Sequence, residues 1–155
     1  MNKIFTLIWP VILCLSIGLL ASRLQIESLE AWYPSLSKPS LTPPNVVFPA
    51  VWGLLYICMG VSFGLVISEP DRPGRNQLIV LFTGQLALNF CWSLAFFYLQ
   101  SPAGGLVVIL LLEAALICYA VKAWSLNKTA SVLFWPYILW VAFATYLNVF
   151  ILMYN

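Results

Sequence analysis

The sequence contains no histidine and few charged residues of either sign. Asp and Glu together number 5, Lys and Arg 7, and charged residues make up 8% of the 155 positions, against about 25% in an average soluble domain. So few charges cannot coat a water-soluble globule, and they also exclude a nucleic-acid-binding protein with a basic face. Without histidine, the chain lacks the side chain that most often serves as general base and metal ligand.

Cysteine is scarce as well, and its spacing does not suggest metal binding. The four cysteines, Cys14, Cys58, Cys91 and Cys118, lie inside apolar stretches, and no two of them form a Cys-x-x-Cys pair. Such thiols are typical of small buried hydrophobic side chains. We therefore expect neither a disulfide framework nor a metal site.

Hydrophobic residues, in contrast, make up 63% of the chain and occur in long continuous runs without period-2 alternation. A bilayer core about 30 Å thick needs roughly 20 apolar residues per helix. The runs predict five transmembrane helices, over residues 4–22, 46–67, 77–99, 104–122 and 130–154. We predict an all-α membrane protein, a bundle of five transmembrane helices that forms a single domain over residues 1–155.

The charges that remain predict the orientation of this bundle. The first apolar run is longer than the core of a secretory signal peptide, so we expect it to be retained as a helix. With five spans, the side of the N-terminus holds Lys3, Arg72, Arg75, Lys122 and Lys128, and the other side holds Arg23 and Lys38. The excess of bases favours a cytoplasmic N-terminus.

The first connection, residues 23–45, is long and rich in proline. Pro34, Pro39, Pro43 and Pro44 fix φ and remove backbone donors, so this segment cannot be helical throughout. Connections beyond about 12–15 residues are usually lids, binding loops or disorder, and the aromatic and leucine side chains here argue against disorder. We interpret the segment as a lid over one mouth of the bundle, with a passive linker as the alternative.

Three predicted helices place aromatic and polar side chains on one face each. The second helix carries Trp52 and Tyr56, the third Gln85, Asn89, Trp92, Ser93 and Phe96, and the fifth Trp140, Ala144, Thr145 and Asn148. Amides that faced lipid would leave donors unsatisfied, so these faces point inward. Hydrogen bonding between helices is one explanation. Tryptophans at membrane depth, away from the interfaces, favour a second one, a pocket for a planar and largely apolar ligand.

Two further features of the spans leave alternatives open. Glu113 is the single acid deep in a predicted span, and it is either a functional group such as a proton relay or a structural acid. Gly60 and Gly64 form a Gly-x-x-x-Gly step, which permits close helix approach within one chain or between two. This step gives weak support to a homodimer.

These motifs together resemble the translocator protein family, also called the TspO/MBR or peripheral benzodiazepine receptor family. The resemblance rests on four motifs in chain order. The first connection carries Trp32-Tyr33, Leu36 to Ser40 and Thr42-Pro43-Pro44, and the second predicted helix carries Phe48 to Trp52 with Tyr56 and Met59-Gly60. The third helix carries Thr83 to Asn89 with Trp92, Phe96 and Phe97, and the fifth carries Pro136-Tyr137, Trp140, Phe143 to Thr145 and Leu147-Asn148. It implies a five-helix bundle, often dimeric, with a cavity beneath the first loop. Family members bind tetrapyrroles such as protoporphyrin IX, and many bind cholesterol and benzodiazepine-type drugs.

Carried over by motif, the resemblance also implies which residues bind the ligand. They are Tyr33, Pro43, Trp52, Tyr56, Asn89, Trp92, Trp140, Phe143, Ala144 and Leu147.

The sterol pattern proposed for vertebrate members needs a base after an aromatic residue at the end of the fifth helix, and none follows Tyr146 or Tyr154. Sterol binding thus loses its main sequence support, and a bacterial cell membrane is favoured over a mitochondrial outer membrane.

The leading hypothesis is a membrane receptor or carrier for porphyrins, without a metal or a further cofactor, in tetrapyrrole transport or stress signalling. Lys38 or Arg23 would pair with the propionates of the porphyrin. One alternative is an enzyme that degrades the bound porphyrin with light or oxygen, with Trp52 and Trp140 as electron donors. Another is a proton-coupled exporter that uses Glu113.

Overall fold

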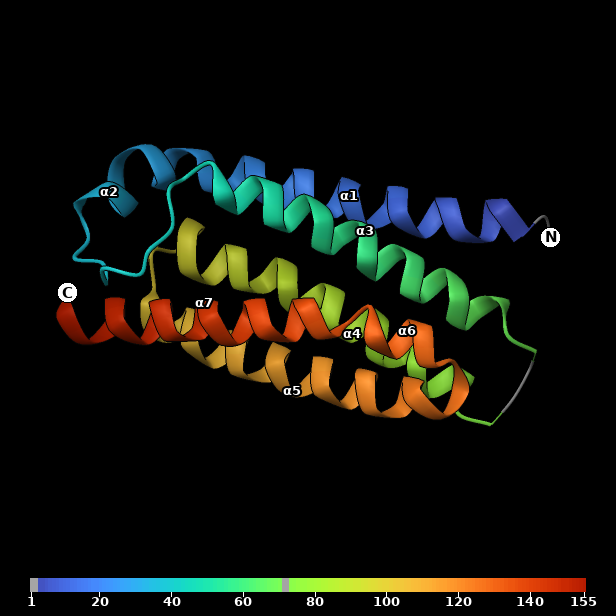
Figure 1. Cartoon of the computed structure of the whole chain (residues 1–155). Helices are drawn as coiled ribbons and strands as arrows, with labels where there is room; N and C mark the ends of the chain where they lie inside the picture. Colours follow the sequence, from blue (N-terminus) through green and yellow to red (C-terminus); the bar gives the residue numbers. More distant parts are fainter. Residues whose placement is uncertain (1–2, 71–72) are drawn as a thin grey trace.

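The computed structural model of the chain describes residues 3–70 and 73–155, and their regular structure is helical (Figure 1). Arg72, one of the bases counted for the orientation, lies outside the described residues. The elements in chain order are α1 (Lys3–Glu27), the π-helix η1 (Ser28–Trp32), α2 (Tyr33–Ser35), α3 (Val47–Ser68), α4 (Arg75–Ser93), the π-helix η2 (Leu94–Tyr98), α5 (Pro102–Leu126), α6 (Lys128–Val132) and α7 (Trp135–Tyr154).

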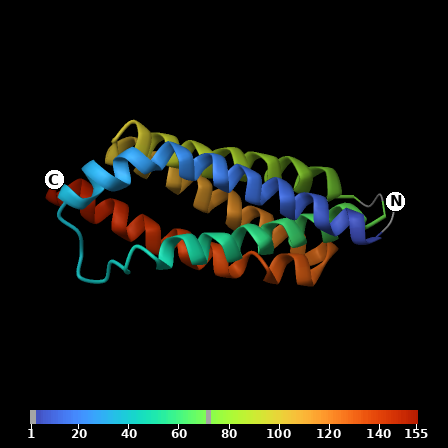
Figure 2. The ribbon, with the colours of Figure 1, turned by 90° about the horizontal axis from the view of Figure 1, so that it is seen from above.

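Five helical segments are long and apolar enough to cross a bilayer. They cover Ile4–Ser35, Val47–Ser68, Arg75–Tyr98, Pro102–Leu126 and Lys128–Tyr154. The segments run side by side, with the N-terminus at one end of the bundle and the C-terminus at the other (Figures 1 and 2). The predicted all-α bundle of five transmembrane helices is confirmed, and the chain is an integral multi-pass membrane protein.

The first helical segment is longer than predicted, and the first connection is correspondingly shorter. The predicted connection begins at residue 23, whereas in the structure the helical backbone continues to Ser35. Pro34 is the second residue of α2, directly after the π-helix η1. The other three prolines of the connection, Pro39, Pro43 and Pro44, fall in the non-helical part, residues 36–46. We call residues 36–46 the lid segment.

The lid segment crosses the end of the bundle where the C-terminus lies (Figure 2). The backbone N–H of Ser37 donates to Oδ1 of Asn155 at 2.9 Å, and the Asn155 amide donates to the carbonyl of Ser37 at 3.2 Å. Thr42 Oγ1 donates to the carbonyl of Pro39 at 2.8 Å. These bonds fix the segment across the bundle end, in keeping with a lid.

The half of the bundle nearer the N-terminus is filled by aromatic side chains. The rings of Phe63 and Phe82 stack at 4.0 Å, and those of Tyr119 and Phe134 lie 4.0 Å apart. Ser62 Oγ donates to the carbonyl of Ala130 at 2.7 Å. Aromatic packing therefore fills the interior of this half. Phe63 and Phe82 also border an open groove of about 490 Å³ between α1 and α4, and the more enclosed space lies in the other half.

The Gly-x-x-x-Gly step of α3 packs against α1 of the same chain. A Cβ at Gly60 would lie 2.4 Å from Cα of Val11, and one at Gly64 would lie 2.9 Å from the carbonyl oxygen of Thr6. The step therefore serves close packing within the chain. It no longer supports a homodimer, which stays a prediction.

Candidate ligand-binding cavity

A cavity of about 410 Å³ lies between α1, α3, α4 and α7, in the half of the bundle next to the lid segment. Small-molecule sites generally measure about 300–1,000 Å³, so the cavity is large enough for a ligand. Eight of the ten residues predicted to bind a ligand line it: Tyr33, Trp52, Tyr56, Asn89, Trp92, Trp140, Ala144 and Leu147.

Pro43 and Phe143 were also predicted at the site, but they do not line the cavity. Pro43 lies in the lid segment, and its neighbour Asn45 reaches the wall instead. On α7, Phe143 directly precedes the wall residue Ala144, so it lies about 100° around the helix from it. The ring centroids of Phe143 and Trp140 lie 5.7 Å apart, and Phe143 thus supports a wall residue.

The first helical segment supplies a wall that the sequence analysis missed. Its lining residues are Gly18, Ala21, Ser22, Gln25, Leu29 and Glu30. Small and polar residues at positions i, i+3, i+4 and i+7, from Gly18 to Gln25, share one helix face, and this pattern could have indicated the wall. It was missed because the predicted helix ended at residue 22, which placed Gln25 in a loop.

Further lining residues come from the other elements: Asn45, Phe48, Pro49, Ser93, Phe96, Phe97, Asn148 and Ile151. Of these, Ser93, Phe96 and Asn148 belong to the predicted polar and aromatic faces. The π-helix η2 contributes Phe96 and Phe97. Most members of the predicted faces thus line the cavity, but Gln85 and Thr145 do not. Gln85 lies beside Met59, and Thr145 Oγ1 donates to the carbonyl of Val141 on its own helix at 2.9 Å.

Flat aromatic rings form much of the wall. Trp52 and Trp92 stack with their ring centroids 6.4 Å apart and an interplanar angle of 29°. Trp92 also stacks on Phe96 at 5.5 Å and 20°, while Trp52 contacts Tyr56 at 5.7 Å. Stacked aromatic faces of this kind offer a large apolar surface with a defined plane, which suits a planar ligand.

The wall amides are engaged by protein groups. Tyr56 OH donates to Oδ1 of Asn89 at 2.8 Å, and Nδ2 of Asn89 donates to the hydroxyl of Tyr137 at 2.7 Å. Asn148 accepts from Nε1 of Trp92 at 3.4 Å, and its Nδ2 donates to the Pro102 carbonyl at 2.7 Å. These amides therefore join helices, as the first interpretation predicts, and they also line the cavity.

A second polar pair joins α1 to α4. Nε2 of Gln25 donates to Oγ of Ser93 at 2.8 Å, and both residues line the cavity. An amide carries two hydrogens and a carbonyl oxygen, so this bond leaves Gln25 with one hydrogen and the oxygen to offer a ligand. Trp140 Nε1 is buried and has no hydrogen-bond partner within the described residues.

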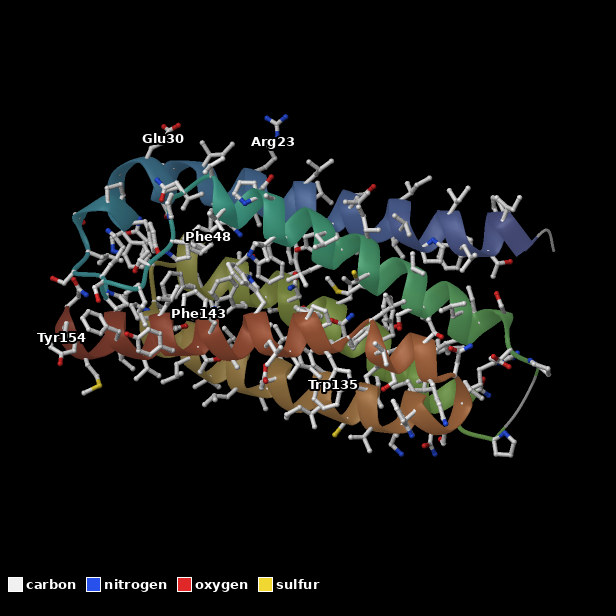
Figure 3. All side chains as sticks on the ribbon, viewed as in Figure 1. Arg23, Glu30, Phe48, Trp135, Phe143 and Tyr154 are labelled. Carbon is white, nitrogen blue, oxygen red and sulfur yellow. The ribbon has the colours of Figure 1, made fainter. Side chains whose placement is uncertain are left out.

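Glu113, Lys38 and Arg23 do not line the cavity. Glu113 belongs to α5, which contributes no residue to the wall in the part of the chain that the structure describes, and its buried Oε2 has no hydrogen-bond partner there. The side chain of Arg23 points away from the bundle (Figure 3). The proposed roles of these residues in proton transfer and in propionate binding therefore find no support in the cavity.

Comparison with known proteins agrees with the motifs and the fold. The sequence profile of the TspO/MBR family matches residues 10–154. The chain is 41% identical to the Tryptophan-rich protein TspO of Chlorobaculum tepidum, over 100% of this chain and 99% of that protein. It is 37% identical to the Tryptophan-rich protein TspO of Archaeoglobus fulgidus, over 99% of both. It is also 39% identical to the human Translocator protein, over 76% of this chain and 70% of the human one. The chain therefore belongs to the TspO/MBR family.

Proposed function

We propose that the protein is a membrane receptor or carrier that binds porphyrins, such as protoporphyrin IX, and related planar apolar ligands in the cavity beneath the lid segment. The observation that carries this proposal is the convergence of Trp52, Trp92 and Trp140, from three helices, on one cavity of about 410 Å³. Stacking on indole rings and burial of apolar surface are the main sources of affinity for a flat macrocycle. The chain contains no histidine, so binding does not depend on axial ligation by imidazole.

In the cell, such a protein serves tetrapyrrole transport or stress signalling. We place it in a bacterial cell membrane, because the base that the vertebrate sterol pattern needs does not follow Tyr146 or Tyr154. We expect a cytoplasmic N-terminus, because the bases gather on that side of the bundle. In a eukaryote, the mitochondrial outer membrane would be the corresponding location. With this orientation, the cavity and the lid segment lie on the side opposite the cytoplasm.

A titration with protoporphyrin IX tests the proposal. The protein is reconstituted in lipid nanodiscs, and binding is followed by the absorbance of the porphyrin and by quenching of tryptophan fluorescence. Trp140→Ala removes a cavity wall and is expected to weaken binding tenfold or more. Trp135→Ala is the matched control, because Trp135 lies on the same helix, is 50% exposed and does not line the cavity. Equal affinities of the two variants would contradict the proposed pocket.

Porphyrin degradation is the second candidate function, and the stacking of Trp52 on Trp92 favours it. The adjacent indole rings are oxidisable groups that line the cavity, and dissolved oxygen would be the oxidant. Under illumination, the wild-type protein would then form a porphyrin product that is absent with Trp52→Phe and Trp140→Phe. Bleaching at the same rate in empty nanodiscs would exclude this activity and leave binding as the function.

A further inference from the structure

We propose that the cavity selects uncharged planar ligands, and that the carboxylates of a bound porphyrin stay in water outside it. This inference rests on the proposed function and specifies the chemical class of ligand that the same site accepts. It follows from the charges at the cavity wall, the engagement of the nearest bases, and the neutral hydrogen-bonding groups that the wall offers.

The wall contains no lysine or arginine among the described residues. Its one acidic residue there is Glu30, whose carboxylate points away from the bundle (Figure 3). A carboxylate taken from water into an apolar site has a large desolvation cost unless a cation pairs with it. Because the wall supplies no cation, a ligand carboxylate inside the cavity would remain uncompensated.

The bases at this end of the bundle do not supply the cation that the cavity wall lacks. The Lys38 ammonium donates to the carbonyls of Tyr33, Pro34 and Leu36 at 2.8, 3.3 and 3.0 Å. An ammonium group has three donors, so all of them are engaged. The same ammonium lies 4.9 Å from the centroid of the Tyr33 ring. A ligand carboxylate would have to displace these carbonyls, which would then lose their partner at the end of a helix.

Arg23 is exposed, and its side chain points away from the bundle (Figure 3). Three further described bases lie at the far end of the molecule. Arg75 Nη1 donates to the carbonyl of Glu69 at 3.0 Å, Lys122 donates to Gln77 at 3.0 Å, and the Lys128 ammonium lies 5.5 Å from the centroid of the Trp124 ring. None of these four side chains lines the cavity.

The polar groups that the wall does offer are neutral. The amides of Asn89 and Asn148 are engaged with other helices, as described above. The Gln25 amide, which bonds to Ser93 across α1 and α4, retains one hydrogen and its carbonyl oxygen. A pyrrole N–H, a ketone or an amide can bond to such a group without bringing charge into the cavity. Gln25 is thus the wall amide that remains able to bond a neutral polar group of the ligand.

The test compares protoporphyrin IX with its bis-carboxamide, which has nearly the same shape and no charge. Binding to the protein in nanodiscs is measured for both, with partition into empty nanodiscs subtracted. We expect the wild-type protein to bind the bis-carboxamide as tightly as the diacid or more tightly. Gln25→Leu is expected to weaken both ligands threefold or more. Gln77→Leu, an exposed glutamine at the other end of the bundle, leaves both unchanged and serves as the control.

A further variant, Lys38→Met, tests whether the Lys38 ammonium pairs with a ligand carboxylate. Expressed as the ratio of variant to wild-type Kd, its effect should be the same for both ligands, because Lys38 acts only through the structure around the lid segment. The inference is overturned if the wild-type protein binds the diacid tenfold more tightly than the bis-carboxamide. A tenfold loss confined to the diacid in Lys38→Met would also overturn it. If neither ligand binds the wild-type protein, the proposed function itself fails.

Discussion

Gln85 and Asn89 lie one helical turn apart on α4, yet their surroundings differ. Both are buried. Asn89 joins the hydroxyls of Tyr56 and Tyr137. Gln85 lies beside Met59, with its Nε2 3.8 Å from the sulfur, and its Oε1 has no partner within the described chain. The spacing of the two residues predicts only that they share one face of the helix. It does not predict which partner each side chain bonds to.

This difference leads to a prediction for a pair of variants. Asn89→Leu leaves two buried hydroxyls without their partner, so we expect it to lower stability by about 1–3 kcal/mol and to weaken porphyrin binding. Gln85→Met, of similar volume, removes an amide with an unsatisfied oxygen and is expected to leave stability unchanged or raise it slightly. Thermal denaturation midpoints in one detergent compare the two variants. A larger loss in Gln85→Met would contradict the assignment of partners.

At the scale of elements, the helices themselves could be predicted from apolar runs, whereas the end of the first one could not. Hydropathy falls after residue 22, and the prolines suggested that the helix ends there. The chain instead continues through η1 and α2 to Ser35. Pro34 follows the π-helix η1 directly, where the i→i−4 hydrogen-bond pattern that proline interrupts is already replaced by π-type bonds. This continuation carries Gln25, Leu29 and Tyr33 to the cavity. A binary pattern of apolar and polar residues does not specify such a π-helical turn.

The contact between α1 and α3 gives a prediction at this scale. Gly60→Ala would place its Cβ 2.4 Å from the Val11 backbone, and backbone atoms cannot move aside as a flexible side chain can. We expect the two helices to separate and the denaturation midpoint to fall. Gly84→Ala is the control, because a Cβ there meets nothing within 4 Å and alanine favours a helix by up to about 1 kcal/mol over glycine. Equal midpoints for the two variants would show that the close contact is not important for stability.

At the scale of the whole molecule, one half of the bundle is packed and the other is hollow. The amide and aromatic faces of three helices could be predicted, and they meet at the cavity. The contribution of α1 and the absence of α5 from the wall depend on how the helices are arranged around the bundle. The sequence does not predict this arrangement. Because these helices are apolar on most of their surface, their residue pattern does not indicate which neighbour each face packs against.

The most direct test of the central claim, that the ligand occupies this cavity, is photocrosslinking with a diazirine-bearing porphyrin. Labelled peptides are identified by mass spectrometry, with and without excess protoporphyrin IX as competitor. The account predicts that competed labels fall on the wall residues of the first helical segment, α3, α4, η2 and α7, and that α5 carries none. Competed labels on α5, or on the lipid-facing groove lined by Leu13, Leu20 and Ala87, would contradict it.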